Sequence, residues 1–421
     1  MSGPLSGVSI LSAEQMHALP HATQLLALMG AEVIKVEPLG GEAGRFGKPT
    51  IRDPDGRDTG MTFVRNNLGK ASIAIDLKSA AGRELFLELA GRVDAVAENF
   101  RPGTADRLGI GWDAVHERNP EAIYVSVSGF GNRSDPPSPY REWAAYAPIV
   151  EGMAGLYEYS RQGDEPPRLC LAGALGDTGP GLYAVIGLLA ALHERNRTGV
   201  GSYVDISMYD AMIAIADIVS PSSMGSEPNR MLEGIGILHA FRAKDGWFSV
   251  EVVRESHFPR FAQTVGHPEW VDDARLASRE GWSEHIESVI RPGVEAWAAS
   301  KTKAEAGAAL AEAGVAAGPV NDASDIRRDP HVRARSFIHT FKGSGAKGSG
   351  AGGSGADAAG SDQQVAVVGN PIAFREGVGG DDDSRAGRWP VLAEDTTSIL
   401  SSRLGLEETE IEALKAQGII R

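Results

Sequence analysis

The chain has little cysteine and no long hydrophobic run. Cys170 is the only cysteine among 421 residues, so no disulfide can form within the chain, as is usual in a reducing compartment; we interpret Cys170 as a small buried hydrophobic side chain. The longest apolar helical stretch, residues 182–192, is shorter than the ~20 residues of a membrane span. The N-terminus lacks the basic and apolar regions of a signal peptide. We therefore expect a cytoplasmic protein without a membrane partner.

The chain also has no excess of basic residues over acidic ones. The formal net charge is −15, which argues against nucleic acid as a partner. The chain contains neither G-x-x-x-x-G-K-[ST] nor G-x-S-x-G, so a P-loop ATPase and an α/β-hydrolase elbow are not indicated. Its Gly129–Gly131 and Gly234–Gly236 pairs lack the strand-to-helix context of a dinucleotide fingerprint.

No metal site is predicted either. His17 and His21 are four residues apart, but Pro20 stands between them and no third ligand is in sight. We expect Pro20 to prevent a regular helix there, and a metal site needs three or four ligands. We expect neither a metal nor a bound cofactor.

The hydrophobic content of 42% and the charged content of 23% are those of an ordinary globular protein. The first 130 residues alternate between strand-like and helical patterns with short glycine-containing joints, which predicts a parallel α/β sheet. The expected strands are residues 8–11, 32–37, 72–76, 93–97, 122–127 and 202–206, and the expected helices include residues 21–29, 80–92, 112–117, 182–195 and 209–218.

We predict two domains. The large, Rossmann-like α/β domain comprises residues 1–220 and 331–421, and a smaller α+β domain comprises residues 225–330, with a strand at 247–252 and helices near 257–265, 283–299 and 303–313. Residues 343–362 are almost wholly Gly, Ser, Ala and Asp, a composition that predicts a flexible surface insertion. A strand at 364–368, an acidic loop at 379–383 and helices near 394–404 and 407–417 follow.

Asp177 is the most informative single residue. It lies in the glycine-rich run GALGDTGPG, residues 173–181, just before an apolar helical stretch. Small neighbours allow a ligand to approach a carboxylate closely, and a helix start favours an anion. The same position also suits an ordinary helix N-cap. The run alone leaves both readings open.

Basic residues follow the ends of two early strands. Lys78 follows the strand at 72–76, and Arg101 and Arg107 follow the segment that ends in Asn99 and Phe100. In open parallel sheets ligands collect at the carboxyl ends of strands, where cations would suit a phosphorylated ligand. The alternative interpretation is that Lys78, Arg101 and Arg107 are ordinary charged residues on the solvated surface.

Together these segments resemble the family III CoA-transferases, a family that includes formyl-CoA and carnitine CoA-transferases and the α-methylacyl-CoA racemases. The resemblance extends from about residue 5 to the C-terminus. Its matching segments are residues 25–37 (LLALMGAEVIKVE), 70–78 (KASIAIDLK), 98–109 (ENFRPGTADRLG), 119–131, 173–181, 198–210 (TGVGSYVDISMYD), 315–320, 329–331 and 404–406.

The resemblance implies that Asp177 is a nucleophile. In the transferases the equivalent aspartate attacks an acyl-CoA thioester and carries CoA to a carboxylic acid through anhydride and aspartyl-CoA thioester intermediates. The expected partners are an acyl-CoA, an organic acid and a second copy of the chain in an interlocked homodimer. The positions that match CoA contacts of the family are Gln15, His17, Ala18, Ile75, Lys78, Asn99, Phe100 and Arg107.

Two alternatives remain. An α-methylacyl-CoA racemase would need a second base opposite Asp177, and the comparable stretch, residues 139–146, has no histidine, although Glu142 could substitute. A CoA-binding homologue without catalysis is conceivable because Pro38 replaces a phosphate-binding arginine and because Gln15 and His17 stand where formyl-CoA transferases carry His and Gln.

Overall fold

The computed structural model describes residues 3–52, 56–133, 135–161, 164–169, 173–225, 234–343, 363–374 and 388–421. Cys170, most of the predicted insertion (344–362) and the acidic loop at 379–383 lie outside these residues. Packing divides the chain into two compact units. Unit 1 comprises Met1–Tyr157, Pro166–Ile218 and Ser336–Arg421, and unit 2 comprises Glu158–Glu165 and Val219–Arg335.

Unit 1 is built on a six-stranded sheet with the strand order β5-β2-β1-β6-β7-β8, and each neighbouring pair is parallel. The chain therefore runs outward from β1 to β5 and then restarts beside β1 with β6. This is the doubly wound arrangement, with its switch point between β1 and β6. The strands are β1 (Ser9–Ala13), β2 (Glu32–Glu37), β5 (Ala71–Ala74), β6 (Ala95–Glu98), β7 (Ile123–Ser128) and β8 (Tyr203–Ser207).

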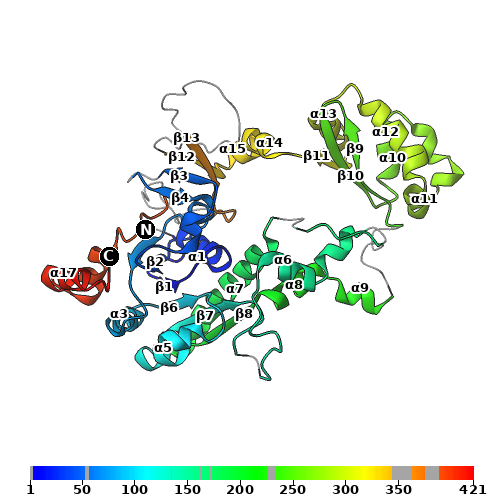
Figure 1. Cartoon of the computed structure of the whole chain (residues 1–421). Coiled ribbons are helices and arrows are strands. Elements are labelled where there is room, and N and C mark those ends of the chain that lie inside the picture. The colour runs from blue at the N-terminus through cyan, green and yellow to red at the C-terminus, as the bar shows by residue number, and fades with distance from the viewer. Residues whose placement is uncertain are drawn as a thin grey trace. The chain divides into compact units, whose positions relative to one another are not determined.

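Helices cover both faces of this sheet (Figure 1). Alternate strand residues face opposite sides: Val125 packs with helices α1 and α7, whereas Tyr124 belongs to the core on the side of α3, α5 and α17. The helices are α1 (Ala18–Leu28), α3 (Ala80–Ala90), α4 (Thr104–Leu108), α5 (Trp112–Arg118), α6 (Ala147–Met153), α7 (Leu175–Thr198), α8 (Met208–Ala216) and α17 (Glu408–Ala416).

The C-terminal segment joins the β5 edge of the sheet. Ile420 forms an antiparallel bridge with Ile75, and the Asp76 N–H donates to the carbonyl of Ile419. Smaller elements complete unit 1: the pairs β3 (Thr50–Arg52) with β4 (Asp58–Gly60) and β12 (Ile338–Gly343) with β13 (Gln363–Val368), and the short helices α2 (Met61–Val64) and α16 (Thr396–Ile399).

Unit 2 combines an antiparallel sheet of order β11-β10-β9 with surrounding helices. Its core is rich in aromatic residues and includes a stacked pair, Phe258 and Trp282. The elements are β9 (Ile237–Ala243), β10 (Gly246–Val252), β11 (Ala316–Pro319), α9 (Val219–Ser223), α10 (Phe258–Thr264), α11 (Arg279–Glu284), α12 (Arg291–Ala298), α13 (Lys303–Glu312), α14 (Ala323–Arg328) and α15 (Pro330–Ala334). The predicted fold class, a parallel α/β part with a smaller α+β part, is confirmed.

Several local predictions were wrong. Helix α1 includes Pro20 in its first turn, where no intrahelical N–H partner is needed. The predicted helix at 283–299 is divided by a π-helical turn at Ile286–Ile290, and strand β9 was missed. Helix α7 is 24 residues long, so by length and composition it could cross a membrane. It packs against α1, α6, α8, β7 and β8, with half of its apolar window buried, as a core helix does.

Candidate active site

A cleft opens at the switch point of the sheet, where the loops after β1 and β6 separate. Its volume is about 150 Å³. Ligands bind at this place in doubly wound sheets because the loops diverge there and leave a crevice. The cleft is lined by Gln15, Met16, His17, Ala18, Asn99, Phe100, Arg101, Pro102, Val127, Ser128, Gly129, Trp143, Ala144, Ala145, Tyr146, Asp177 and Met208.

Asp177 reaches this cleft from the first turn of α7. The helix begins at Leu175, and the residue in the N-cap position is Ala174, with a positive φ of 64° and no side-chain cap. The interpretation of Asp177 as a helix N-cap is therefore wrong. Its carboxylate lies in the first turn, close to the positive end of the helix dipole, with 22% of the side chain exposed.

The glycines around Asp177 admit neighbouring helices. A Cβ on Gly176 would lie 2.7 Å from the carbonyl oxygen of Ala147 on α6, and one on Gly181 would lie 2.7 Å from that of Ala18 on α1. A Cβ on Gly179 would lie 2.5 Å from Ile215 on α8. We expected these small residues to leave space for a ligand, but three of the glycines instead allow close packing of neighbouring helices. Only Gly173 faces open space.

The electrostatic surroundings favour the neutral form of Asp177. Burial raises the pKa of this carboxyl, the charge of Glu151 adds to the increase, and Arg65 opposes both effects, so that the resulting pKa is about 6. Glu151 is buried in α6, where its carboxylate accepts hydrogen bonds from the Gly176 N–H at 2.8 Å and from the Tyr157 hydroxyl at 2.6 Å. A carboxylate with a pKa near neutrality is a typical active-site group.

His17 connects Asp177 to Arg65. Its Nδ1 lies 3.5 Å from Asp177 Oδ2, and its Nε2 lies 2.9 Å from Arg65 Nη2. Because a guanidinium can only donate, Nε2 must accept and the proton must reside on Nδ1, facing Asp177. Burial lowers the pKa of His17 to about 4, with Arg65 and His21 adding to the effect, so the ring is neutral at physiological pH.

Side-chain hydrogen bonds hold the loop that carries His17. Gln15 and Asn99 exchange two hydrogen bonds of 2.9 Å, which join the ends of β1 and β6. Met16 has a positive φ of 64°, uncommon for a residue with a side chain, and its N–H donates to Glu42. These contacts fix the backbone that aims His17 at Asp177.

A buried charge network lies beneath this loop. Glu14 Oε1 accepts from Lys70 Nζ at 2.7 Å and lies 3.5 Å from Lys35 Nζ. All three side chains are buried. Lys70 and Lys35 hold the pKa of Glu14 at about 2 against the opposing effect of burial, which is the largest single influence. Desolvation lowers the pKa of Lys70 to about 7, although Glu14 opposes it.

The structure brings five of the predicted CoA-binding residues to the cleft: Gln15, His17, Ala18, Asn99 and Phe100. Three others lie elsewhere. Lys78 is exposed just beyond β5, and Arg107 is exposed on α4, where it donates to Thr104 at 2.8 Å. Ile75 is buried in the core beside α3 and α17, because the C-terminal segment covers it.

Glu142, the predicted alternative base, is exposed and does not line the cleft. Sequence reasoning missed Arg65 and Glu151. Arg65 is 48 residues from His17, and Glu151 is 25 residues from Gly176. No spacing or motif marks such partners before the fold is known. Within the described residues, no group of three metal-binding side chains is found.

Comparison with known proteins identifies the family. A family model described as CoA-transferase family III matches residues 5–368. The chain belongs to this family. It is 31% identical over 408 residues to a succinyl-CoA:mesaconate CoA-transferase of Haloarcula hispanica, covering 94% of this chain and 96% of that protein. The predicted family and the predicted type of enzyme, a CoA-transferase, are confirmed.

Further relatives of this family III chain have names that specify different carboxylic acid substrates. A succinyl-CoA–D-citramalate CoA-transferase of Chloroflexus aurantiacus is 34% identical over 343 residues, covering 80% of this chain and 83% of that protein. A formyl-CoA:oxalate CoA-transferase of Streptomyces avermitilis is 27% identical across both full chains. Among solved structures, a CAIB/BAIF family protein of Brucella suis superposes with a TM-score of 0.79 at 28% identity, covering 96% of this chain and all of that one.

Proposed function

We propose that the enzyme moves CoA from an acyl-CoA to a carboxylic acid by covalent catalysis on Asp177. The supporting observation is the position of this carboxylate, which enters the switch-point cleft from a rigid helix and has a pKa raised by burial to about 6. Desolvation weakens the hydration that would otherwise quench a carboxylate nucleophile. Covalent catalysis divides one difficult transfer into easier steps.

In the first half of the proposed reaction, an Asp177 oxygen attacks the thioester carbonyl. The C–S bond breaks, CoA leaves as a thiolate, and a mixed anhydride forms. The thiolate then attacks the carboxyl carbon of Asp177 and releases the donor acid, which leaves an aspartyl-CoA thioester. The Nδ1–H group of His17 faces this carboxylate at 3.5 Å, and it would donate to the oxyanion that forms on the aspartyl carbon.

The second half repeats these steps in reverse. The acceptor carboxylate attacks the aspartyl carbon and expels the CoA thiolate, and the thiolate attacks the acceptor's acyl carbon. The C–O bond to Asp177 breaks, so the products are a new acyl-CoA and a free carboxylate. The bond energy of the thioester is retained throughout, because no step admits water.

We propose succinyl-CoA as the first donor to test and small dicarboxylic acids as acceptors, because several relatives carry these substrates in their names. Lys78 and Arg107 are proposed to contact the distal, phosphorylated part of CoA, since both are exposed beyond the ends of their strands. A second copy of the chain is the expected partner, and the cytoplasm is the expected location. The exposed apolar side chains on α7, Leu182, Tyr183, Ile186 and Leu189, support a homodimer.

Trapping of the covalent intermediate tests this proposal. The enzyme is incubated with succinyl-CoA and then hydroxylamine, and the modified peptide is identified by mass spectrometry. A hydroxamate on Asp177 is expected, and Asp177→Asn should remove both the adduct and CoA transfer. Incorporation of deuterium at the α-carbon of a 2-methylacyl-CoA, without any acceptor acid and without the adduct, would instead support a racemase. Tight CoA binding with neither reaction would support a non-catalytic homologue.

A further inference from the structure

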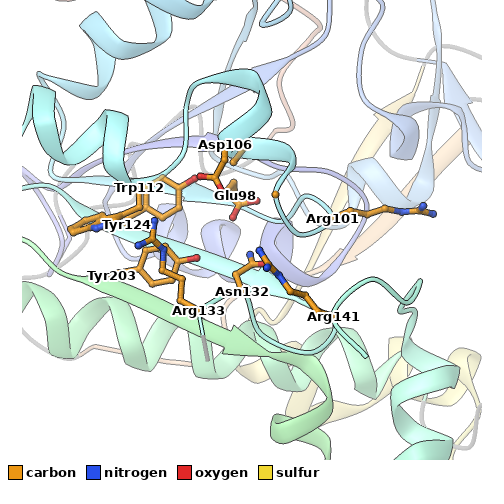
Figure 2. A pocket seen from close by; sticks show the side chains of 11 residues that line it. Glu98, Arg101, Asp106, Trp112, Tyr124, Asn132, Arg133, Arg141 and Tyr203 are labelled. Atoms are coloured by element: carbon orange, nitrogen blue, oxygen red, sulfur yellow. The ribbon is translucent and has the colours of Figure 1, made fainter. Parts of the chain in front are cut away.

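A second cavity lies in unit 1, on the other side of the segment that follows β6. Its volume is about 230 Å³. Glu98, the last residue of β6, lies on one side, and Asn132, Arg133 and Arg141 from the segment after β7 lie on the other (Figure 2). The rings of Trp112 on α5 and Tyr203 on β8 provide aromatic walls. This cavity does not include Asp177 or any group of the proposed mechanism.

Two polar atoms of this cavity have no partner within the described parts of the chain. They are Nε of Arg141 and Oδ1 of Asn132, and both are buried from solvent. Two other groups of Asn132 have partners: its backbone N–H donates to Asp205, and its Nδ2 donates to Ser126 Oγ at 2.6 Å. The amide is therefore held so that its oxygen is left as an acceptor. Buried polar atoms without partners are uncommon in folded proteins and call for an explanation.

The cations of the cavity are only partly compensated. No carboxylate of the described residues lies within ion-pair distance of Arg141. Arg133 has one ion-pair partner among them, exposed Asp113 at 3.2 Å, and its guanidinium also lies over the ring of Tyr203, 5.0 Å from the centroid. Figure 2 shows the Arg141 guanidinium and the Glu98 carboxyl directed toward the same space from opposite sides. Glu98 is buried, its Oε2 accepts from the Phe100 N–H at 2.8 Å, and no described cation pairs with it.

The charge state of Glu98 agrees with an anionic ligand. Burial raises the pKa of Glu98, hydrogen bonds from Ser126 and Phe100 oppose this increase, and the charges of Asp106 and Asp205 add to it, so that the resulting pKa is about 7. A neutral carboxylic acid can donate a hydrogen bond and does not repel an anion. The cavity lining therefore combines three guanidinium groups, those of Arg101, Arg133 and Arg141, with two carboxyl groups, those of Glu98 and Asp106, and one amide oxygen that can only accept.

We infer that this cavity is a binding site for a small hydroxycarboxylate. Its carboxylate would pair with Arg141 and Arg133, because guanidinium groups bind carboxylates with charge-assisted hydrogen bonds. Its hydroxyl would donate to Asn132 Oδ1, which needs a donor that a simple carboxylate does not carry. The carbon skeleton would pack against Trp112 and Tyr203. Arg101 lines both this cavity and the Asp177 cleft, so the bound acid would lie next to the catalytic cleft.

Calorimetric titration of the full-length enzyme tests the site, with malate as the hydroxylated probe and succinate as the matched acid without a hydroxyl. No CoA ester is present, so transfer cannot occur. Malate is expected to bind at one site, at least about tenfold more tightly than succinate. Succinate has no hydroxyl group, so its binding would leave the amide oxygen of Asn132 without a hydrogen bond. Arg141→Met should weaken malate binding at least about tenfold. Asn132→Ala should reduce malate affinity to that of succinate.

Two control variants separate this site from others. Arg327→Met, on α14 in unit 2, should leave malate binding unchanged. Asp177→Asn should also retain malate binding, although it would abolish the proposed transfer, so the two proposals can fail independently. Equal affinity for malate and succinate would overturn the hydroxyl assignment. Absence of malate binding at about 10 mM, or full binding by Arg141→Met, would overturn the site.

Discussion

The two ring nitrogens of His17 contact groups of opposite charge. Nδ1 lies 3.5 Å from Asp177 Oδ2, and Nε2 lies 2.9 Å from Arg65 Nη2. Arg65 thus fixes the tautomer of His17, and that tautomer presents an N–H to the carboxylate of Asp177. This relationship gives the first prediction.

Replacement of His17 by leucine should lower kcat about 10²-fold, the usual effect of losing one oxyanion donor. Replacement by glutamine should retain most of the activity, because an amide N–H can also donate. Steady-state rates with a saturating acyl-CoA measure both effects. Equal losses in the two variants would show that the imidazole does more than donate a hydrogen bond.

The pH dependence of kcat/KM should report the titration of Asp177. The nucleophile must be ionised, so activity should fall as the pH drops through about 6, the pKa that burial gives this group. His17 has a pKa of about 4, so its protonation should not change the rate between pH 5 and pH 8. The measurement is the rate profile from pH 5 to 8 with a non-titrating substrate.

Two variants should move that profile in opposite directions. Glu151→Gln removes a negative charge that raises the pKa of Asp177, so its acidic limb should move to lower pH. Arg65→Gln removes a charge that lowers this pKa, so the limb should move to higher pH. Shifts in the same direction for both variants would contradict this assignment of charges.

Substitution of Glu14 by glutamine should destabilise the protein by about 3 kcal/mol, because buried Lys70 would lose its carboxylate partner at 2.7 Å and Lys35 would keep only Glu42, 3.7 Å away. Chemical denaturation measures the free energy of unfolding. The matched control is Glu412→Gln, which breaks an exposed pair with Lys415 at 2.8 Å and should cost less than about 1 kcal/mol. A similar loss in both variants would refute the special role of the buried network.

Gly176→Ala should cost about 1–3 kcal/mol, the usual range for overpacking, because the new methyl group would press on the Ala147 carbonyl. Gly40→Ala is the control, since a Cβ there meets nothing within 4 Å. Activity should also fall in Gly176→Ala, because Asp177 is the next residue. Thermal unfolding and turnover together check this prediction, which fails if Gly176→Ala behaves as the control does.

Lys78→Gln and Arg107→Gln should raise the KM for acyl-CoA with little change in kcat, since groups that contact a remote part of the substrate contribute uniform binding. An acyl thioester that lacks the nucleotide provides the control. With that shortened substrate, the variants and the parent enzyme should have the same KM. A lower kcat in either variant would place these cations closer to the reacting atoms.

The regular elements were predicted well where the hydrophobic period is strong. Strand β2 has the predicted bounds, 32–37, and helix α5 lies within one residue of its prediction. The π-helical turn at Ile286–Ile290 has no pattern that distinguishes it from an α-helix. The resemblance to the family placed residues of the loops after β1 and β6 in one site, and the structure brings them together because parallel strands have their carboxyl ends at the same edge of the sheet.

The remainder of the site depends on tertiary contacts. Ile75 matches a family position that contacts CoA, but antiparallel pairing with Ile420 places it beneath the C-terminal segment. Arg65 and Glu151 shift the pKa of Asp177 from distant parts of the chain. Desolvation, the largest cause of that shift, is a property of the assembled fold and cannot be read from residue types.

The convergence of α6, α8 and α1 on the glycine faces of α7 has a kinetic consequence. Because three neighbouring helices pack against these glycines, the start of α7, which carries Asp177, cannot shift without displacing them. In the proposed reaction, the acyl group, the sulfur atom and the incoming acid would therefore each move to the carboxylate of Asp177. The turnover rate should then be limited by the exchange of these reactants at the carboxylate of Asp177. The pantetheine arm of CoA has many rotatable bonds, so it is the part of the substrate best suited to such movement.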